Sequence, residues 1–262
     1  MTILDEIVEQ KRIEVKKRKS KTVLKELKRM PFFDRQPYLL KDFLLNPDKS
    51  GIIAEFKRKS PSKGIINNKV NIEDVVSAYE KAGASAVSVL TDSDFFGGNL
   101  KDLQAARKTL KIPLLRKDFI IDTFQIYEAK AYGADVILLI AAVLNKNEID
   151  EFAFLSKELG LSVLFEIHNI DELAIINEHI DIVGINNRNL KTFEVSIQNS
   201  IELASQIPAR CVKVSESGIS NIANILKLKK YGFHGFLIGE SFMKTENPGQ
   251  AAFDFMKKLK NE

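Results

Sequence analysis

Short apolar runs alternate with amphipathic stretches from residue 51 to the end of the chain. The apolar runs have the length and composition of buried strands, and the stretches between them carry apolar residues at helical spacing, often with glycine near the end. Eight strands are predicted, over 52–56, 86–91, 113–117, 135–140, 162–167, 181–186, 211–216 and 235–239. The pattern therefore indicates eight successive strand–helix units.

Repeated strand–helix units indicate a parallel sheet, because each parallel strand needs a crossover connection. An open doubly wound sheet and a closed (β/α)8 barrel both have this pattern. The chain has 262 residues and lacks both GxGxxG and GxxxxGK[ST], which favours the closed barrel. We predict an α/β fold, a TIM barrel forming a single domain over residues 1–262, with residues 1–48 as an N-terminal helical extension packed on the barrel.

Composition narrows the class of protein. The chain is 45% hydrophobic and 28% charged, which is typical of soluble domains. No apolar run approaches the ~18 residues of a membrane-spanning helix, and the amino terminus lacks the pattern of a signal peptide. The single cysteine, Cys211, excludes an internal disulfide and fits a reducing compartment. We therefore expect a cytoplasmic protein with no membrane partner.

The net charge of +4 is unevenly distributed, because a basic segment runs from Lys11 to Arg29. Such a segment is able to bind nucleic acid, but no aromatic residue stands among its basic ones. A solvated helix face is the favoured interpretation, so we expect no nucleic-acid partner. The three histidines are scattered without metal-ligand spacing, so no metal site is expected.

Candidate chemistry lies where the predicted strands end, because barrel enzymes place their active sites at the carboxyl ends of the strands. The polar residues at these ends include Glu55, Lys57, Lys117, Glu166, Asn186 and Glu216. Strand geometry directs Glu55 and Lys57 inward and Phe56 toward the helices. Two lysines and three carboxylates at one opening shift one another's pKa values and suit acid/base chemistry on an anionic substrate. Taken one at a time, each side chain has the plainer interpretation of a strand-end charge that reaches water.

A phosphate site is indicated near the last two strands. Gly218 and Gly239 follow the seventh and eighth strands, and the loops at these positions commonly bind phosphate in barrel enzymes. The turn SPSKG, which contains Ser60, adds hydroxyl groups after the first strand. The alternative is that these glycines and this turn only redirect the chain.

Motifs along nearly the whole chain resemble those of the indole-3-glycerol phosphate synthase family. They are ILDEIVEQKRIEV, IIAEFKRKSPSKG, SVLTDSDFFGG, LLRKDFIID, ADVILLIAAVL, LFEIH, GINNRNL, VSESGI and GFLIGESFM. The family converts 1-(2-carboxyphenylamino)-1-deoxyribulose 5-phosphate into indole-3-glycerol phosphate in tryptophan biosynthesis, with loss of carbon dioxide and water. The resemblance implies a carboxy-lyase that uses no cofactor or metal and acts on a small phosphorylated substrate. We expect a monomer, with a weak homodimer as the alternative.

The resemblance also implies roles for individual residues. Lys117 would be the general acid that protonates the substrate carbonyl, Lys57 would contact the substrate carboxylate, and Glu166 would assist the later proton transfers. Glu55 and Asn186 would hold substrate hydroxyls. The other expected substrate-binding residues are Phe96, Phe119, Leu138, Arg188, Glu216 and Ser217. The expected phosphate-binding residues are Ser60, Gly218, Gly239, Glu240 through its backbone N–H, and Ser241.

The sequence departs from the family pattern at two positions. Glu240 stands where serine occurs in some members of the family, and a carboxylate there would repel phosphate. Asn99 stands where serine is frequent in the family.

Three alternative functions remain. Another phosphate-binding barrel enzyme, such as a sugar-phosphate isomerase, would need the phosphate loops without the lysine–glutamate set. A nucleic-acid-binding protein would use the basic segment instead, and an inactive or bifunctional relative is the third alternative.

Overall fold

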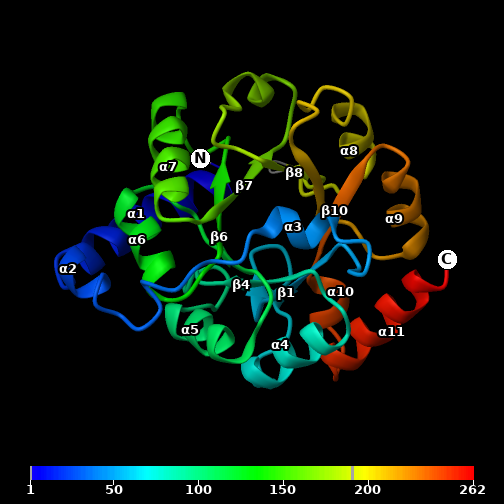
Figure 1. The fold of residues 1–262 in the computed structure, drawn as a ribbon, viewed down its shortest axis with the longest axis horizontal. Helices are drawn as coiled ribbons and strands as arrows, with labels where there is room; N and C mark the ends of the chain where they lie inside the picture. The colour runs from blue at the N-terminus through cyan, green and yellow to red at the C-terminus, as the bar shows by residue number, and fades with distance from the viewer. Residues whose placement is uncertain (1, 190–191) are drawn as a thin grey trace.

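Eight parallel strands close into a barrel, as the rhythm of the sequence predicted (Figure 1). The computed structural model describes residues 2–189 and 192–262. The barrel strands are β1 (Ile52–Phe56), β4 (Ala86–Leu90), β5 (Leu114–Lys117), β6 (Val136–Ile140), β7 (Ser162–Ile167), β8 (Ile182–Asn186), β9 (Val212–Glu216) and β10 (Phe233–Ile238). Their bounds lie within two residues of the predicted ones. Leu190, the last residue of the GINNRNL motif, lies outside the described residues.

Helices follow the strands and cover the outside of the barrel. They are α4 (Ile72–Lys81), α5 (Leu100–Thr109), α6 (Thr123–Ala131), α7 (Lys146–Glu158), α8 (Gln198–Leu203), α9 (Ile222–Lys229), α10 (Glu240–Met243) and α11 (Pro248–Lys260). A short 3-10 helix, Asp171–Ile175, follows β7 where the other units have an α-helix. The hairpin of β2 (Lys59–Ser60) and β3 (Gly64–Ile65), which the sequence pattern did not predict, follows β1.

Asparagine or aspartate precedes many of these helices, and its side chain accepts hydrogen bonds from N–H groups of the first turn. These N-cap residues are Asn71, Asn99, Asp122, Asn145, Asn221 and Asn247. Asn99, one of the two departures from the family pattern, therefore has a structural role as the cap of α5. It also donates a side-chain hydrogen bond to Asp102.

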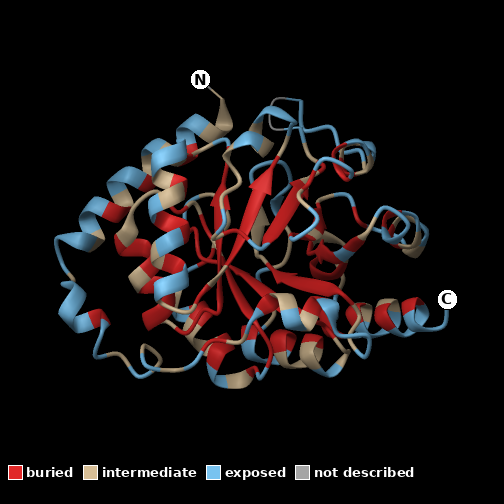
Figure 2. Cartoon of the chain, turned by 45° about the horizontal axis from the view of Figure 1, so that its top comes forward, coloured by how far each residue is buried: buried red, intermediate tan, exposed pale blue. Residues whose placement is uncertain are grey.

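The strands are the most buried part of the molecule (Figure 2), and their two faces belong to different cores. Ile52, Ala54 and Phe56 of β1 pack in the cluster between the barrel and the helices, whereas Ile53 packs inside the barrel. Because side chains alternate along a strand, Glu55 faces the barrel interior with Ile53. The alternation that the sequence predicted for Glu55 and Phe56 is therefore present.

Residues before the barrel form α1 (Ile3–Lys19), α2 (Leu24–Leu27) and α3 (Leu40–Leu45). Val15 of α1 and Leu27 of α2 pack with Phe124 of α6 in a small cluster of their own. In contrast, α3 lies across the near end of the barrel in Figure 1 and inserts Leu40 and Leu44 into the inner core. The barrel is thereby closed at the amino ends of its strands and stays open at the other.

The basic segment from Lys11 to Arg29 is only partly a solvated helix face, so that prediction was wrong in part. Lys11 is 1% exposed, because its side chain turns from α1 into the protein. Arg18 pairs with Glu128 of α6, and Lys19 pairs with Asp122. Part of the charge therefore attaches α1 to the barrel. Among the described residues, no helix is both long and apolar enough to cross a membrane.

A buried carboxylate joins the segment before α3 to the barrel. One oxygen of Asp135 accepts hydrogen bonds from the Arg35 guanidinium at 2.5 Å and from the Tyr38 N–H at 2.8 Å. The other accepts from Arg107 at 2.6 Å and from the Leu114 N–H at 2.8 Å. Because Asp135 is 0% exposed, water has little access to its oxygens as a substitute for these donors.

We expect Asp135→Asn to lower the free energy of unfolding by about 3–5 kcal/mol, because it leaves two arginines facing a neutral side chain in a buried site. Denaturant unfolding followed by circular dichroism measures this change. Asp48→Asn, at an exposed position, is the control and should stay within about 0.5 kcal/mol of wild type. A change at Asp135 as small as that of the control would contradict the assigned role.

Candidate active site

A cavity of about 500 Å³ opens at the carboxyl ends of the strands. Every residue that the sequence singled out for the site lines it: Glu55, Lys57, Ser60, Phe96, Lys117, Phe119, Leu138, Glu166, Asn186, Arg188, Glu216, Ser217, Gly218, Gly239, Glu240 and Ser241. These residues are far apart in the sequence. The fold brings them together because the parallel strands all end on the same side of the barrel.

Four charged side chains at the base of this cavity form one layer across the barrel. Glu55, Lys117, Glu166 and Glu216 come from β1, β5, β7 and β9, which are alternate strands in the barrel order. Alternate strands contribute side chains to the same layer of a (β/α)8 barrel. The residues two positions earlier, which are Ile53, Leu115, Leu164 and Val214, all belong to the inner apolar core. We call the upper four residues the charged layer; the inner apolar core lies below it.

Two glycines give the charged layer its space. A Cβ at Gly184 would lie 2.1 Å from Oε1 of Glu216, and a Cβ at Gly239 would lie 2.3 Å from Oε1 of Glu55. Side chains at these positions would force the carboxylates out of place. Gly239 therefore leaves the space that the Glu55 carboxylate occupies, in addition to its expected role in binding phosphate.

Ion pairs hold the charged layer together. The ammonium of Lys117 lies 3.0 Å from Glu166 and 3.2 Å from Glu216. Lys57 lies just past the end of β1, and its ammonium is 2.6 Å from Glu55. The carboxylate and the ammonium that stand two residues apart in the sequence are therefore each other's partner.

The electrostatic balance around Lys117 is set by burial and by its carboxylate neighbours. Burial lowers the pKa of Lys117, but Glu166, Glu216 and Glu55 outweigh burial and raise the pKa well above its ordinary value. Three carboxylates in the same layer therefore stabilise the ammonium form. Lys117 therefore holds its proton tightly.

Glu166 and Glu216 share Lys117 but ionise differently. Burial raises the pKa of Glu216 to about 7; Lys117 opposes this effect and Glu166 adds to it. Burial also raises the pKa of Glu166. However, Lys117, His168 and Asn186 outweigh burial and together hold the pKa of that carboxyl well below its usual range. Glu166 is therefore the permanently charged carboxylate, and Glu216 is the one that takes up a proton near neutral pH.

His168 is a site residue that sequence reasoning missed. Its Nε2 lies 3.3 Å from Glu166, and its Nδ1 lies 3.6 Å from Glu172. Burial lowers the pKa of His168, but these two carboxylates outweigh burial and raise it to about 10. The signal was its spacing, because a residue two positions after Glu166 continues the inward face of β7. Asn186 donates to the same Glu166 oxygen at 3.0 Å, so it orients a carboxylate within the protein.

One side of the cavity is apolar. The rings of Phe96 and Phe119 lie 6.1 Å apart, and Leu138 lines the cavity with them. Residues of α1, among them Ile3 and Ile7, also line the cavity. The helical pattern of α1 was visible in the sequence, but nothing in it indicated that its apolar residues face the site.

The opposite side is polar and rich in backbone N–H groups. Ser217 and Gly218 follow β9 with φ angles of 65° and 71°, so two successive residues adopt the left-handed region. For serine this conformation carries a backbone cost of order 1–3 kcal/mol, and such strain clusters at functional sites. Lys63, from the turn SPSKG that the sequence indicated, lines the cavity too, and so does Lys244, which was not predicted. Two lysines beyond the charged layer make its opening more favourable for an anion.

Arg188 lines the cavity, and its guanidinium donates a hydrogen bond to the carbonyl oxygen of Phe193 at 3.4 Å. Asp92, at the end of β4, turns away toward α1, where Lys11 pairs with it. In the described part of the chain, no cluster of three or more His, Cys, Asp or Glu side chains has an arrangement that would hold a metal ion.

Comparison with known sequences identifies the family. The sequence model of indole-3-glycerol phosphate synthase matches residues 4–255. The chain belongs to the indole-3-glycerol phosphate synthase family. A relative of that name from Bacteroides thetaiotaomicron is 49% identical, over 98% of both chains. Relatives of the same name from Polynucleobacter asymbioticus and Salinibacter ruber are 45% and 42% identical, over at least 94% of each chain.

Solved structures with low sequence identity share the fold. The tryptophan synthase complex from Pyrococcus furiosus contains a chain that is 16% identical to this one, with a TM-score of 0.59 over 80% of this chain and 98% of that one. The tryptophan synthase alpha chain from Legionella pneumophila is 13% identical, with a TM-score of 0.61 over 85% and 95%. At this identity the likeness supports the barrel fold and nothing more specific.

The raised pKa of His168 predicts how its contribution to stability changes with pH. A group whose pKa is about 10 in the folded protein and near 6.5 in the unfolded chain stabilises the fold fully below about pH 6.5 and loses that effect as pH rises toward 10. We therefore expect the difference in unfolding free energy between wild type and His168→Gln to be larger at pH 6 than at pH 10.

Denaturant unfolding of both proteins at pH 6, 8 and 10 measures this difference. His234→Gln, at an exposed position on β10, is the control for the chemical change itself. A difference between wild type and His168→Gln that stays constant across the three pH values would show that His168 is not held as a cation by Glu166 and Glu172.

Proposed function

We propose that the chain converts 1-(2-carboxyphenylamino)-1-deoxyribulose 5-phosphate into indole-3-glycerol phosphate through the charged layer, with Lys117 as the proton donor. The observation that carries the assignment is the contact of the Lys117 ammonium with Glu166 and Glu216 at the base of the cavity. An apolar wall and a polar wall flank this ammonium, which matches a substrate with an aromatic ring at one end and a phosphate at the other.

The two ends of the substrate set its orientation. The anthranilate ring is assigned to the wall of Phe96, Phe119 and Leu138, because aromatic rings pack favourably on such surfaces. The phosphate is assigned to Ser60 and to the loops after β9 and β10. There Gly218, Gly239 and Glu240 offer backbone N–H groups, and Ser241 offers a hydroxyl. The carboxylate of Glu240 would repel phosphate, so only its N–H is assigned to binding.

Ring closure begins with attack of the carboxylate-bearing ring carbon on the substrate carbonyl carbon. The carbonyl oxygen gains negative charge as the new bond forms, and Lys117 donates a proton to it. A lysine with a raised pKa is a weak acid toward a carbonyl, but it is a competent acid toward the alkoxide that the attack creates. The tight hold of the carboxylates on the resting ammonium is therefore compatible with proton transfer during the reaction.

Loss of carbon dioxide then restores the aromatic ring, and loss of the new hydroxyl as water completes the indole. Lys57 is assigned to the substrate carboxylate before it leaves, because its ammonium stands beside Glu55 at the cavity wall. Glu166 is assigned to the later proton transfers, since it is the carboxylate held in its charged form. Glu55 is assigned to the substrate hydroxyls. Asn186 shares that role and also orients Glu166.

Arg188, Glu216 and Ser217 complete the proposed substrate-binding set. Arg188 supports the anionic groups at the opening, and Glu216 adjusts the charge around Lys117 as it gains or loses a proton near neutral pH. Ser217 holds the strained turn that presents Gly218. The proposed reaction needs acids and bases that these side chains supply.

We also propose that the chain acts as one domain and as a monomer in the cytoplasm, on a small phosphorylated substrate. The helices before β1 support the proposal of one domain, because α3 fills the end of the barrel and α1 lines the cavity.

We expect Lys117→Met to lower kcat by at least about a hundredfold, since it removes the general acid. Turnover is followed by the fluorescence of the indole product, and circular dichroism establishes that the variant is folded. Lys146→Met, which changes an exposed lysine of α7 paired with Asp150, is the matched control and should retain wild-type turnover. Turnover of folded Lys117→Met within about threefold of wild type would remove Lys117 from the role.

A further inference from the structure

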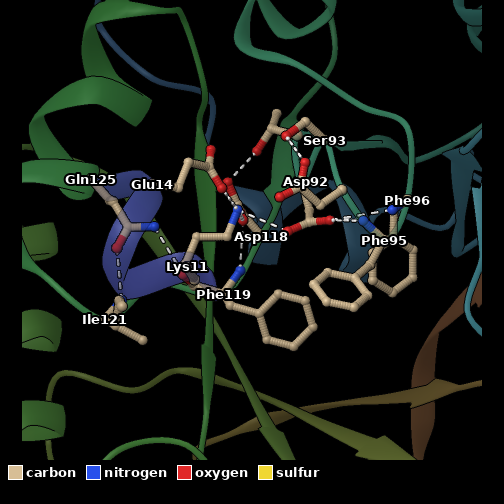
Figure 3. A network of polar contacts seen from close by, with 12 residues as sticks. Lys11, Glu14, Asp92, Ser93, Phe95, Phe96, Asp118, Phe119, Ile121 and Gln125 are labelled. Carbon is tan, nitrogen blue, oxygen red and sulfur yellow. Dashed lines mark hydrogen bonds and ion pairs between the residues drawn. The ribbon is translucent and has the colours of Figure 1, made fainter. Parts of the chain in front are cut away.

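Lys11 is a buried cation with no direct place in the proposed reaction. It projects from α1, and its ammonium lies 2.6 Å from Glu14 of the same helix. It also lies 2.9 Å from Asp92 and 2.9 Å from Asp118, which follow β4 and β5 (Figure 3). All these contacts lie where water has little access, since the Lys11 side chain is 0% exposed. One ammonium therefore joins the amino-terminal helix to two loops of the barrel.

Both aspartates also hold the backbone of the apolar wall. Oδ1 of Asp92 accepts hydrogen bonds from the N–H groups of Phe95 at 2.8 Å and Phe96 at 3.2 Å. Oδ1 of Asp118 accepts from the N–H of Phe119 at 2.9 Å. In Figure 3 the side chains of Phe96 and Phe119 lie on the same side of this network. Each aspartate thus connects Lys11 to the backbone of one wall residue.

The two aspartates depend on Lys11 to different degrees. Asp118 has further partners, because Arg116 pairs with it at 2.9 Å and the Thr91 hydroxyl donates to it. Among the described residues, Lys11 is the only cation paired with Asp92, and Asp92 is 2% exposed. Without Lys11, Asp92 would be a buried charge lacking a counter-ion, which is strongly unfavourable. Movement of the turn 92–96 toward water would relieve this cost, and Phe96 would move with the turn.

We propose that Lys11 is a positioning residue for substrate binding, and that it acts by fixing Phe96 and Phe119 through Asp92 and Asp118. The proposal rests on the proposed function, because it takes these two rings as the wall that binds the aromatic end of the substrate. It gives α1 a function beyond packing: the helix carries the charge that aligns the wall. The expected consequence is a loss of affinity for substrate, since Lys11 touches none of the groups assigned to proton transfer.

The experiment compares Lys11→Met with wild type at a temperature where both are folded. KM is expected to rise about tenfold, while kcat at saturating substrate falls less than about threefold, because ground-state binding is lost and the proton donor is intact. Lys19→Met is the matched control, since Lys19 lies on the same helix and pairs with Asp122 of the same barrel loop, but at the surface. It should keep the wild-type KM.

A double-mutant cycle with Phe96→Ala tests whether Lys11 acts through the wall. Phe96→Ala alone should raise KM, and adding Lys11→Met should raise it by clearly less than the tenfold seen in wild type. Equal increases in both backgrounds would overturn the route through Phe96. A wild-type KM in folded Lys11→Met would overturn the positioning role while leaving the proposed function intact. A wild-type KM in Phe96→Ala would overturn the wall assignment and this inference together.

If Lys11→Met does not fold, the pair Lys11→Met/Asp92→Asn replaces it. This pair removes both charges, while the side-chain oxygen of the new asparagine still accepts from Phe95 and Phe96. The connection between the turn and α1 is broken in this variant too, so KM is expected to rise, but by less than in Lys11→Met, because no unpaired buried charge is left to drive the turn toward water. A wild-type KM in this pair would overturn the inference.

Discussion

The organisation of the active site depends on one ammonium group held among three buried carboxylates. Lys117 and its neighbours Glu55, Glu166 and Glu216 form a single layer because they come from alternate strands of the barrel. The inner apolar core of the barrel lies below it and excludes water from that side. The three carboxylates raise the pKa of Lys117, whereas burial, with Glu166 adding to it, raises the pKa of Glu216 to about 7. Because the carboxylates outnumber the Lys117 ammonium, a second cation is favoured beside them. Lys57 is that cation, and it pairs with Glu55.

The residues around this layer make the arrangement possible. Gly184 and Gly239 lack the Cβ atoms that would displace two of the carboxylates. His168 and Asn186 both contact the same oxygen of Glu166, so that carboxylate stays charged while Glu216 titrates. The amino-terminal helix contributes from outside the barrel, because α1 lines the cavity and Lys11 reaches the loops after β4 and β5. The site therefore combines a charged layer set by the strands with walls set by loops and by α1.

The sequence predicted the barrel and the positions of its strands, because the units repeat an apolar strand pattern and a helical pattern, often with glycine near the end of the helix. It also predicted many of the residues that line the cavity, some because the ends of parallel strands must meet and others through the family resemblance. It did not predict Lys11 or His168 as parts of the site. Lys11 stands in a run of basic residues whose local pattern is that of a solvated helix, and only the tertiary fold places two aspartates around it. The pKa of Lys117 could not be predicted either, because it depends on the summed distances to three carboxylates from different strands.

The charge state of Lys117 in the free enzyme tests the account most directly. Nuclear magnetic resonance of protein labelled at lysine Cε follows each ammonium through a pH titration, and Lys117→Arg assigns the resonance. We predict that Lys117 keeps the chemical shift of an ammonium up to and beyond the pH at which exposed lysines titrate, near their ordinary pKa of about 10.4. A Lys117 resonance that titrates below that pH would mean that burial outweighs the three carboxylates, and it would contradict the electrostatic basis proposed here for the site.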